Sequence, residues 1–495
     1  MKKKNSALIL ALLMLASSAV GCSEGSTENT PAGESSAEEN ISAEIVETVE
    51  EEPEWKAFDN LPEQNFGGQT YTILSRMDNE TQFHSEELTG DAVNDSVFDR
   101  NLAVMGRYNI KIEVPTIDGS WGNNEKYIAD IRSSIQSGDG AYELIDGYAA
   151  VVGSLVVDGC YYLLNDIKYM EPTERWWSPS AVEDLAIDGN VYLTPGDISM
   201  SLYDNIFAFF FNQRLFDEFQ LEDPYTLVDE GRWTYDKFLE LCAKCQIDSD
   251  GNGVYDSLDT YGAVFSDDLE FNNFHFAFRI PITVKGEDGR PVLNLGEESV
   301  ADLVDTMKKL AYGTEGVYYS KGDDTTKMNM FMAGQCAIMP NLLGSIKNLR
   351  EVEDDFGVLP YPKKNEAQDG YYTTSRDNSI LFGIPVDVKD ADFAGLISEA
   401  LCQASYEMVK PVYYENVLKT KLARDEESQK MIDILRDGII LDPGAVYALQ
   451  LQRAGFLVRD CVYYDYEYAS YYRQSKKKFE KVLEKFLESF GSQSE

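Results

Sequence analysis

The chain has very little histidine and only half as many basic as acidic residues. Its 495 residues include two histidines, His84 and His275, far apart in the sequence. Zinc sites and acid–base catalysis that rely on histidine are therefore poorly supported. The 43 lysine and arginine residues stand against 86 aspartate and glutamate residues, a formal net charge of −43. Because such a chain gains nothing from neutralising phosphates, the composition argues against nucleic acid as a partner.

Long apolar runs are absent from the sequence after its N-terminal segment. Lys2–Lys4 supply positive charge, Ala7–Ala16 form an apolar stretch, and small residues precede Cys22. This pattern is typical of a secretory signal peptide, here residues 1–21. The apolar stretch is too short to span a bilayer.

The cleavage region Ala19–Cys22 resembles the lipobox of bacterial lipoproteins. In such proteins the cysteine is diacylated and becomes the mature N-terminus, and two acyl chains make a stable anchor. Ordinary secretory cleavage beside an incidental cysteine is the alternative. We predict lipidation at Cys22, which would place the protein on the extracellular face of the cell membrane.

The segment after Cys22 differs in composition from the rest of the chain. Ser23–Lys56 contains eleven glutamates and one lysine, with few large apolar residues. Such a segment repels itself, so residues 22–60 are predicted to be a lipidated cysteine followed by an acidic, disordered tether. The whole chain is 43% hydrophobic and 12% aromatic, which suits one large or two medium domains with a sizeable core.

Six cysteines follow Cys22, and only two of them are close in sequence. Cys242 and Cys245 form a CxxC pair within Phe238–Cys245, whose apolar residues have helical spacing. Because no second CxxC follows, a zinc site is not indicated. We predict buried free thiols on an apolar helix face and no disulfide.

Apolar spacing predicts a mixed α/β fold. Gln69–Leu74, Tyr108–Val114 and Tyr142–Gly147 are predicted strands, and a segment with helical spacing lies in each interval between them. This order describes βαβ units with parallel strands. Ile206–Asn212 is continuously apolar, as expected for a strand buried on both faces.

Helix signals follow in the second half of the chain. Thr234 is a predicted N-cap for a helix that continues through Cys245. Phe479, Leu483, Phe486 and Phe490 form the apolar stripe of a predicted terminal helix that ends at Gly491.

Three motifs together carry a family resemblance. Phe211–Phe216 with Gly231–Phe238, then Phe331–Met339, then Phe356–Pro362 resemble segments of family 1 extracellular solute-binding proteins, in the same order and spacing. These are maltose-binding-protein-like receptors of carbohydrate ABC importers. The resemblance covers about residues 66–410, whereas the tyrosine-rich C-terminal part of the chain departs from the family pattern.

The resemblance implies a two-lobe α/β fold of the periplasmic-binding-protein type II, with hinge strands that cross between the lobes. The first lobe would comprise 61–198 and 355–385, and the second 199–340 and 390–495. Thr194–Asp197 would make the first crossing, and the Met339–Asn341 region and the stretch after Pro385 the others.

The function implied by the resemblance is carbohydrate capture by lobe closure, without catalysis. The expected partners are a sugar or oligosaccharide and the membrane subunits of an ABC importer, with the protein as a monomer. Two alternatives stay open: a secreted glycoside hydrolase, because an acid and a nucleophile could hide among 86 carboxylates, and a cell-surface carbohydrate adhesin.

Sugar sites need aromatic rings to pack on the C–H face of a pyranose and polar groups for its hydroxyls. Trp176 and Trp177, adjacent in a polar segment, are the first candidates, and packing of both inside a lobe is the alternative. Trp121, within the loop Asp118–Asn124, is another. The polar candidates are Asn341, Arg376 and Asn378.

A loop at Asp248–Asp259 matches the EF-hand pattern, with Gly253 at the sharp turn. Its oxygen donors would be Asp248, Asp250, Asn252, the Val254 carbonyl, Asp256 and Asp259. Position 12 is aspartate rather than the usual glutamate, which shortens its reach. We predict a structural Ca²⁺ on the second lobe and no organic cofactor; a solvated acidic turn is the alternative.

Overall fold

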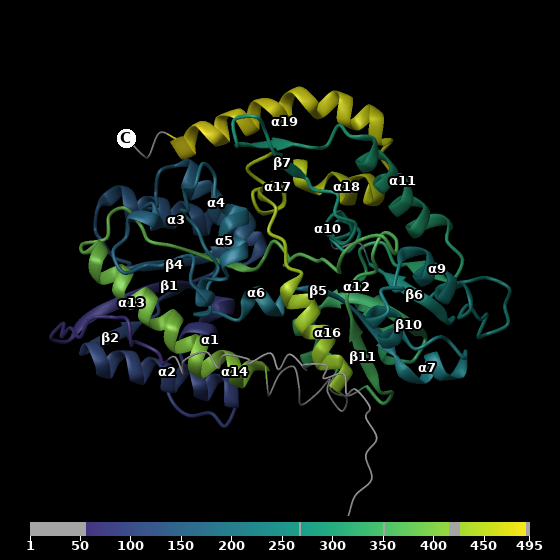
Figure 1. The fold of residues 1–495 in the computed structure, drawn as a ribbon, viewed down its shortest axis with the longest axis horizontal. Coiled ribbons are helices and arrows are strands. Elements are labelled where there is room, and N and C mark those ends of the chain that lie inside the picture. Colours follow the sequence, from purple (N-terminus) through teal and green to yellow (C-terminus); the bar gives the residue numbers. More distant parts are fainter. Residues whose placement is uncertain (1–55, 267–268, 350–351, 415–425, 492–495) are drawn as a thin grey trace, which may run out of the picture. The chain divides into compact units, whose positions relative to one another are not determined.

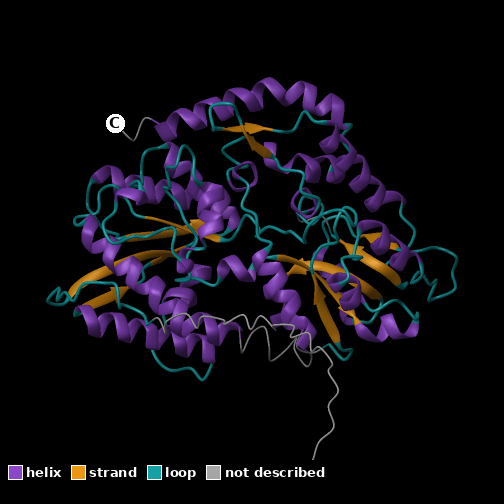
Figure 2. Ribbon diagram, in the orientation of Figure 1, coloured by secondary structure: helices purple, strands orange, loops and turns teal. Residues whose placement is uncertain are grey.

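The computed structural model describes residues 56–266, 269–349, 352–414 and 426–491. All of them belong to Trp55–Glu495, the second of two units into which the chain divides. This unit contains two five-stranded sheets, each with helices beside it (Figure 1, Figure 2). The predicted signal peptide, Cys22 and most of the predicted tether lie outside the described residues.

The first sheet has the order β12-β4-β1-β2, with β3 paired to the end of β1. Its strands are β1 (Gln69–Arg76), β2 (Ile110–Glu113), β3 (Thr116–Ile117), β4 (Leu144–Tyr148) and β12 (Ile380–Gly383). β1 is parallel to β2, β3 and β4, whereas β12 is antiparallel to β4. α2 (Ala92–Tyr108) and α3 (Asn124–Ser137) connect the parallel strands. The predicted βαβ units are confirmed.

The second sheet has the order β11-β5-β10-β6-β9. Its strands are β5 (Phe207–Asn212), β6 (Tyr261–Phe265), β9 (Val317–Tyr319), β10 (Cys336–Leu342) and β11 (Phe356–Leu359). β5 lies between two antiparallel neighbours, and each of its six residues is buried, which confirms the prediction for this apolar run. β6 is parallel to β9 and β10.

The other elements surround these sheets. The remaining strands form a hairpin, β7 (Thr283–Lys285) and β8 (Pro291–Leu293). The remaining α-helices are α1 (Glu80–Phe83), α4 (Ala149–Val157), α5 (Pro179–Leu185), α6 (Ser201–Asp204), α7 (Gln213–Glu218), α8 (Pro224–Asp229), α9 (Tyr235–Ala243), α10 (Phe274–Ala277), α11 (Glu298–Gly313), α12 (Asp324–Met332), α13 (Ala391–Ala404), α14 (Lys410–Tyr413), α16 (Glu426–Asp437), α17 (Pro443–Val446), α18 (Leu457–Tyr463) and α19 (Tyr468–Gly491). Short 3₁₀ segments are η1 (Met77–Asn79), η2 (Trp121–Asn123), η3 (Leu164–Asp166), η4 (Arg175–Trp177), η5 (Leu343–Leu349) and η8 (Ala454–Phe456), and η6 (Ser405–Val409) is a π-helical turn.

Two local predictions about helices are confirmed. The Thr234 hydroxyl accepts a hydrogen bond from the Lys237 amide at the start of α9. The apolar stripe of α19 is buried, including Phe486 and Phe490, whose rings pack against Tyr447. No helix among the residues that the structure describes is long and apolar enough to cross a membrane.

In the part of the chain that the structure describes, two segments that link the sheets can be followed through their bridges. Thr194 bridges Phe382 of the first sheet, and the chain enters the second sheet at β5 about a dozen residues later. The first link between the sheets therefore starts at Thr194, where the predicted crossing Thr194–Asp197 begins. The return runs through 373–379, where Ser375 bridges Ile206 and Ile380 pairs with Tyr148. The predicted crossing at Met339–Asn341 is wrong, because these residues pair with β5 inside β10.

The structure also differs from the predicted lobe boundaries. β11 was expected in the first lobe but pairs with β5, so it belongs to the second sheet. α13 was expected in the second lobe but packs on β1, where the Phe393 and Tyr71 ring centroids are 5.8 Å apart. α19 begins on the second lobe, where the Tyr468 hydroxyl donates to the Leu295 carbonyl, and ends against Tyr192 of the first. These pairings join residues far apart in sequence, which local patterns do not reveal.

The fold starts earlier than predicted, and the six cysteines after Cys22 are buried. The fold begins before residue 61, since the Phe58 amide donates to Gln403 Oε1 at 2.9 Å. Cys160, Cys242, Cys245, Cys336, Cys402 and Cys461 are all buried free thiols. The predicted free thiols are thus confirmed, but the predicted shared helix face is wrong for Cys245, which lies in the turn after α9. Burial raises the pKa of both thiols.

Candidate functional site

Three strands of the first sheet, β1, β3 and β4, end at the same edge because they are parallel. Arg76 is the last residue of β1, and Tyr148 is the last residue of β4. Asp78 lies in η1, two residues after the end of β1, and Trp121 lies on the loop after β3. Ligands of open α/β sheets bind outside the carboxyl ends of the strands, so this edge is the candidate site.

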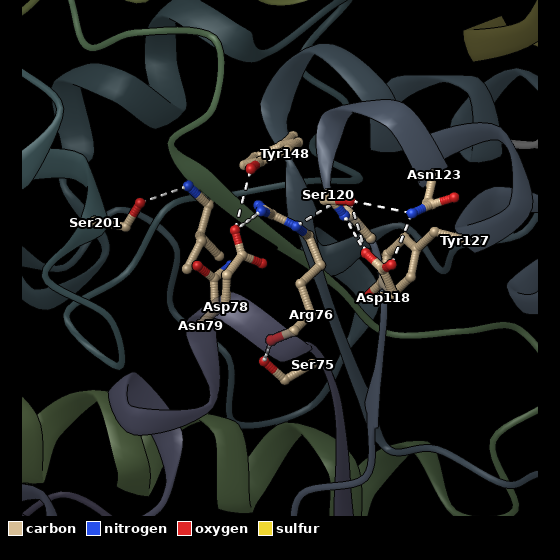
Figure 3. Close-up of polar contacts among 12 residues, drawn as sticks. Ser75, Arg76, Asp78, Asn79, Asp118, Ser120, Asn123, Tyr127, Tyr148 and Ser201 are labelled. Atoms are coloured by element: carbon tan, nitrogen blue, oxygen red, sulfur yellow. Dashed lines mark hydrogen bonds and ion pairs between the residues drawn. The ribbon is translucent and has the colours of Figure 1, made fainter. Parts of the chain in front are cut away.

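Arg76 organises the edge although its side chain is only 1% exposed. Its Nε donates to the Gly119 carbonyl at 3.0 Å, and its guanidinium pairs with Asp78 and lies 3.0 Å from the centre of the Tyr148 ring. The Tyr148 hydroxyl donates to Asp78 at 3.2 Å (Figure 3). Gly119 permits this approach, because a Cβ there would lie 2.7 Å from Arg76 Cγ. The half-exposed carboxylate of Asp78 is thereby fixed in place.

A buried carboxylate, Asp146, binds the backbone at Arg76. Asp146 on β4 is fully buried and accepts hydrogen bonds from the Arg76 amide and the Ser75 hydroxyl, both at 3.0 Å. Burial raises the pKa of Asp146 to about 6, although these hydrogen bonds and the Arg76 charge oppose the shift. The contacts tie β4 to the end of β1.

Trp121 is held at this edge by its own loop. The Asp118 carboxylate accepts from the Ser120 amide and hydroxyl and from Asn123 Nδ2, and these hydrogen bonds hold the pKa of Asp118 below its usual value (Figure 3). The Trp121 side chain is 52% exposed, and its ring centroid is 6.4 Å from that of Tyr148. One exposed indole and one phenol therefore share the edge.

The returning crossing segment adds polar groups beside Tyr148. The Ala149 amide donates to Ser379 O at 2.9 Å and the Ala150 amide to Asp377 O at 3.0 Å. The Arg376 amide donates to Asn205 O, just before β5. Arg376 and Asn378 therefore lie where the two sheets meet.

The second sheet contributes a buried ionic cluster at the carboxyl end of β6. Lys327 pairs with Glu270, both nearly inaccessible, and lies 2.8 Å from Asp324. Burial alone would raise the pKa of Asp324, but Lys327 and more weakly Arg376 hold it below its usual value. The influence of Arg376 connects this cluster with the crossing segment.

Residues 107–401 match a family described as bacterial extracellular solute-binding protein. This match covers more than half of the chain. The chain belongs to that family. Its members bind solutes and do not catalyse reactions, so the protein is a receptor rather than a glycoside hydrolase.

Solved structures share the fold of this solute-binding protein. UspC of M. tuberculosis is 14% identical, with a TM-score of 0.57 over 83% of this chain and 100% of that one. A cyclo/maltodextrin-binding protein in complex with maltotetraose is 14% identical, with a TM-score of 0.54 over 86% and 97%. The GacH receptor of Streptomyces glaucescens is 13% identical, with a TM-score of 0.54 over 84% and 99%. The predicted two-lobe α/β fold is thus confirmed. No curated protein matches the sequence.

Four of the six predicted ligand-binding residues lie near strand ends or on the crossing segment, and the other two, Trp176 and Trp177, form a second group. Trp121, Arg376 and Asn378 lie at or beside the candidate edge. Asn341 lies at the end of β10 in the second sheet, is 8% exposed, and accepts from the Ser345 hydroxyl at 2.8 Å.

Trp176 and Trp177 form the second group and lie inside the solute-binding protein. They are 1% and 0% exposed, and their indole N–H groups donate to the two carboxylate oxygens of Glu399 at 2.5 and 2.6 Å. Their rings present no open face to a sugar, which favours the packing alternative. The sequence pattern did not reveal this burial, because the hydrogen-bond partner Glu399 on α13 is more than 200 residues away in sequence.

Sequence reasoning missed Arg76, Asp78 and Tyr148. A signal was available, because all three lie at or just after the ends of predicted strands, where binding residues gather in parallel sheets. Asp146 was missed for another reason. A carboxylate inside a predicted strand is expected to be one of the polar residues that alternate with apolar ones and face solvent.

The EF-hand-like loop has a defined conformation. Asp248 Oδ1 accepts from the Gly251 amide and Oδ2 from the Gly253 amide, both at 2.8 Å. Ligand oxygens of Asp248, Asp250 and Asp259 lie within 4.8 Å of one another, and Asp259 is fully buried. Because the loop precedes β6, it lies at the opposite end of that strand from the ionic cluster.

The buried Glu399 makes stability depend on pH. Burial raises its pKa to about 7, although Trp177, Gln403, Glu171 and Trp176 all donate to it. In the unfolded chain its pKa is about 4.3, so the folded protein binds this proton more tightly than the unfolded chain does. The free energy of unfolding therefore falls as pH rises from about 4 to about 7. We expect Glu399→Gln, which cannot titrate, to remove this loss of up to about 4 kcal/mol. Urea unfolding of both proteins across this range tests it; a wild type–variant difference that does not change with pH would contradict it.

Proposed function

We propose that this solute-binding protein captures a neutral sugar or oligosaccharide at the edge formed by Arg76, Trp121 and Tyr148. The carrying observation is the half-exposed Trp121 ring beside Tyr148. A tryptophan ring can pack on the C–H face of a pyranose, and the neighbouring Asp78 carboxylate can accept from its hydroxyls. Solved relatives of the same fold that bind maltotetraose or acarbose support the choice of ligand class.

Charge pairing supports a neutral ligand rather than an ion. Arg76 is paired with Asp78, Arg376 lies 3.7 Å from Asp377, and Lys327 is paired with Glu270. Each cation therefore has a carboxylate partner, and an anionic solute would have to compete with it. Hydroxyl groups can donate to the carboxylates and accept from the cations without breaking a pair.

The two sheets and their connecting segments support capture by lobe closure. The ligand would first contact the edge of the first sheet, and the second sheet would close over it by rotation about the crossing segments. The closed, loaded receptor would then deliver its sugar to the membrane subunits of an ABC importer. One copy of the protein is sufficient for this cycle, so we expect it to act as a monomer.

Replacing Trp121 tests the site. Trp121→Ala should weaken sugar binding by about 1–3 kcal/mol, roughly 5- to 150-fold, because stacked area is lost while Arg76 stays paired. A thermal-shift screen of mono- and oligosaccharides first identifies a ligand, which stabilises the fold by mass action. Titration calorimetry then compares the variants.

Tyr255→Ala is the matched control. Tyr255 is also 52% exposed, but it precedes β6 of the second sheet and lies away from the strand ends that carry Arg76 and Tyr148. Its affinity should equal that of the wild type. Equal affinity of Trp121→Ala and wild type would remove Trp121 from the site, and the absence of any stabilising sugar would contradict the proposed ligand class.

We also propose that the loop Asp248–Asp259 binds a structural Ca²⁺. Its donors would be Asp248, Asp250, Asn252, the Val254 carbonyl, Asp256 and Asp259. The convergence of three carboxylates within 4.8 Å supports this, since without a cation these charges repel one another. Gly251 and Gly253 adopt left-handed backbone angles, φ 70° and 78°, that the tight loop requires.

Ca²⁺ should raise the melting temperature, and chelation should lower it, because the ion binds only the folded loop. Mg²⁺ should substitute poorly, since it demands a smaller octahedral site. Asp248→Ala should abolish the response to chelator, whereas Asp288→Ala, in another exposed acidic turn, should leave it intact. Identical melting of the wild type in Ca²⁺ and in chelator would identify the loop as an acidic turn only.

The proposed lipid anchor is tested separately at Cys22. Cys22→Ala should release the protein from the membrane fraction or leave an uncleaved precursor, because the acylated residue is gone. Cell fractionation with metabolic labelling by a fatty acid measures both outcomes. An unchanged membrane fraction would contradict lipidation, while Cys160→Ala, at a buried thiol, should keep the anchor.

A further inference from the structure

The C-terminal part of the chain contacts both lobes. It starts beside the crossing segment, where Ile439 bridges Thr373, and continues through α17 and α18 into α19. α19 is one continuous helix of 24 residues (Figure 1). A helix of this length extends about 36 Å, so its two ends can be held by different lobes. We call residues 439–491 the strap.

Hydrogen bonds attach the strap to the second lobe at and before the start of α19. The Tyr468 hydroxyl donates to the Leu295 carbonyl, and the Tyr312 hydroxyl of α11 donates to the Val462 carbonyl at 2.8 Å. Tyr468 and Val462 are buried. The first turn of α19 and the segment before it therefore belong to the second lobe.

The far end of α19 contacts the first lobe. The Phe490 ring centroid is 5.3 Å from that of Tyr192, and the Phe490 carbonyl accepts from the Tyr192 hydroxyl at 3.3 Å and from Asn190 Nδ2 at 3.4 Å. Earlier in the strap, Gln450 Nε2 donates to the Ala150 carbonyl of α4 at 3.1 Å. Because both hydrogen bonds at the helix end are long, the buried Phe490 ring is the main part of that contact.

The strap lies on the side of both sheets where parallel strands end. Ala150, which contacts Gln450, comes two residues after β4. The Gly455 carbonyl accepts from Asn272 Nδ2 at 3.0 Å, in the segment after β6. Ligands of open α/β sheets bind outside these carboxyl ends. Separation of the two edges to admit a ligand would therefore pull on the strap.

The end of α19 on the first lobe is the one that such a separation releases. Sharp helix kinks arise mostly at proline or glycine, and residues 468–490 contain neither. With its first turn bonded to the second lobe, α19 moves with that lobe as a rod and carries Phe490 away from Tyr192. The Leu441 amide also donates to Asp184 of the first lobe, but it lies close to the crossing segment, where a rotation displaces the chain least.

We propose that the strap restrains the opening of the receptor, which opens when Phe490 leaves its place against Tyr192. This inference rests on the lobe rotation of the proposed function and adds the element that limits it. While Phe490 is packed, the strap ties the carboxyl edges of the two sheets together. Its release exposes an apolar ring to water, which opposes opening. The strength of this contact therefore sets the fraction of open receptor.

Distances between spin labels on the two edges provide the test. Glu125→Cys, at the start of α3, and Thr325→Cys, at the start of α12, are both exposed and follow the first and second sheet strands β3 and β9. Cys22→Ser in every sample removes one further thiol, and the other six cysteines are buried. Double electron–electron resonance then measures the distance distribution in the full chain without sugar.

Phe490→Ala should increase the population at long distances severalfold over the same labelled chain without it, because the packing at Tyr192 is lost. Gln450→Ala, which acts outside α19, should give a smaller change in the same direction and serves if Phe490→Ala does not fold. Glu488→Ala is the matched control, since Glu488 is exposed on the same turn of α19. Its distribution should equal that of the unsubstituted chain.

Unchanged distributions in the folded Phe490 and Gln450 variants would overturn the proposal, and so would an equal change in Glu488→Ala. These measurements contain no sugar, so their failure would leave the sugar site at Trp121 untouched. Conversely, a sugar screen without a ligand would not alter a distance change caused by Phe490→Ala.

Discussion

The carboxylate of Asp146 is the contact on which the candidate site depends. It is fully buried on β4, yet it accepts from the Arg76 amide and the Ser75 hydroxyl of β1 and from the Tyr127 hydroxyl of α3. Burying a carboxylate costs free energy, as its raised pKa shows, and several donors are needed to offset that cost. The same contacts fix where β1 ends, and therefore where Arg76 meets Tyr148. The packing of the edge and the geometry of the candidate site therefore both depend on this one buried carboxylate.

The crossing segment has a similar role between the sheets. The Thr374 amide donates to Oδ1 of Asn273, the residue before α10, at 3.0 Å, and the Thr373 hydroxyl donates to Phe207 O in β5 at 2.8 Å. Ser379 O accepts from the amide of Ala149, the residue after β4. A few residues thus bond to both sheets. Rotation of one sheet against the other would therefore bend the backbone of this segment and of the one after Thr194. The polar groups beside Tyr148 lie on the segment that such a rotation bends.

How far the sequence predicts this structure depends on the range of the interactions. Strand β5 and the Thr234 cap were predictable, because an apolar run or a single hydroxyl acts within a few residues. The burial of Trp176 was not, because its partner Glu399 is 223 residues away. β11 was assigned to the wrong lobe for the same reason, since its pairing with β5 is invisible in local spacing. In the candidate site, Trp121 stood out as a loop aromatic, whereas Arg76 and Tyr148 become partners only when β1 and β4 lie side by side.

Net charge and local pairing act in the same direction at the candidate site. A formal charge of −43 creates a field that repels anions at long range and has no such effect on a neutral solute. Close to the site, the cations that could have attracted an anion are each held by a carboxylate, as Arg76 is by Asp78 and Lys327 by Glu270. A free cation is also poorly served, because every such carboxylate already has a partner. What remains favourable is exchange of hydrogen bonds with hydroxyl groups and packing on an exposed indole, interactions that depend little on ionic strength. The proposed preference for a neutral solute therefore rests on how the charges are paired, even in a chain this acidic.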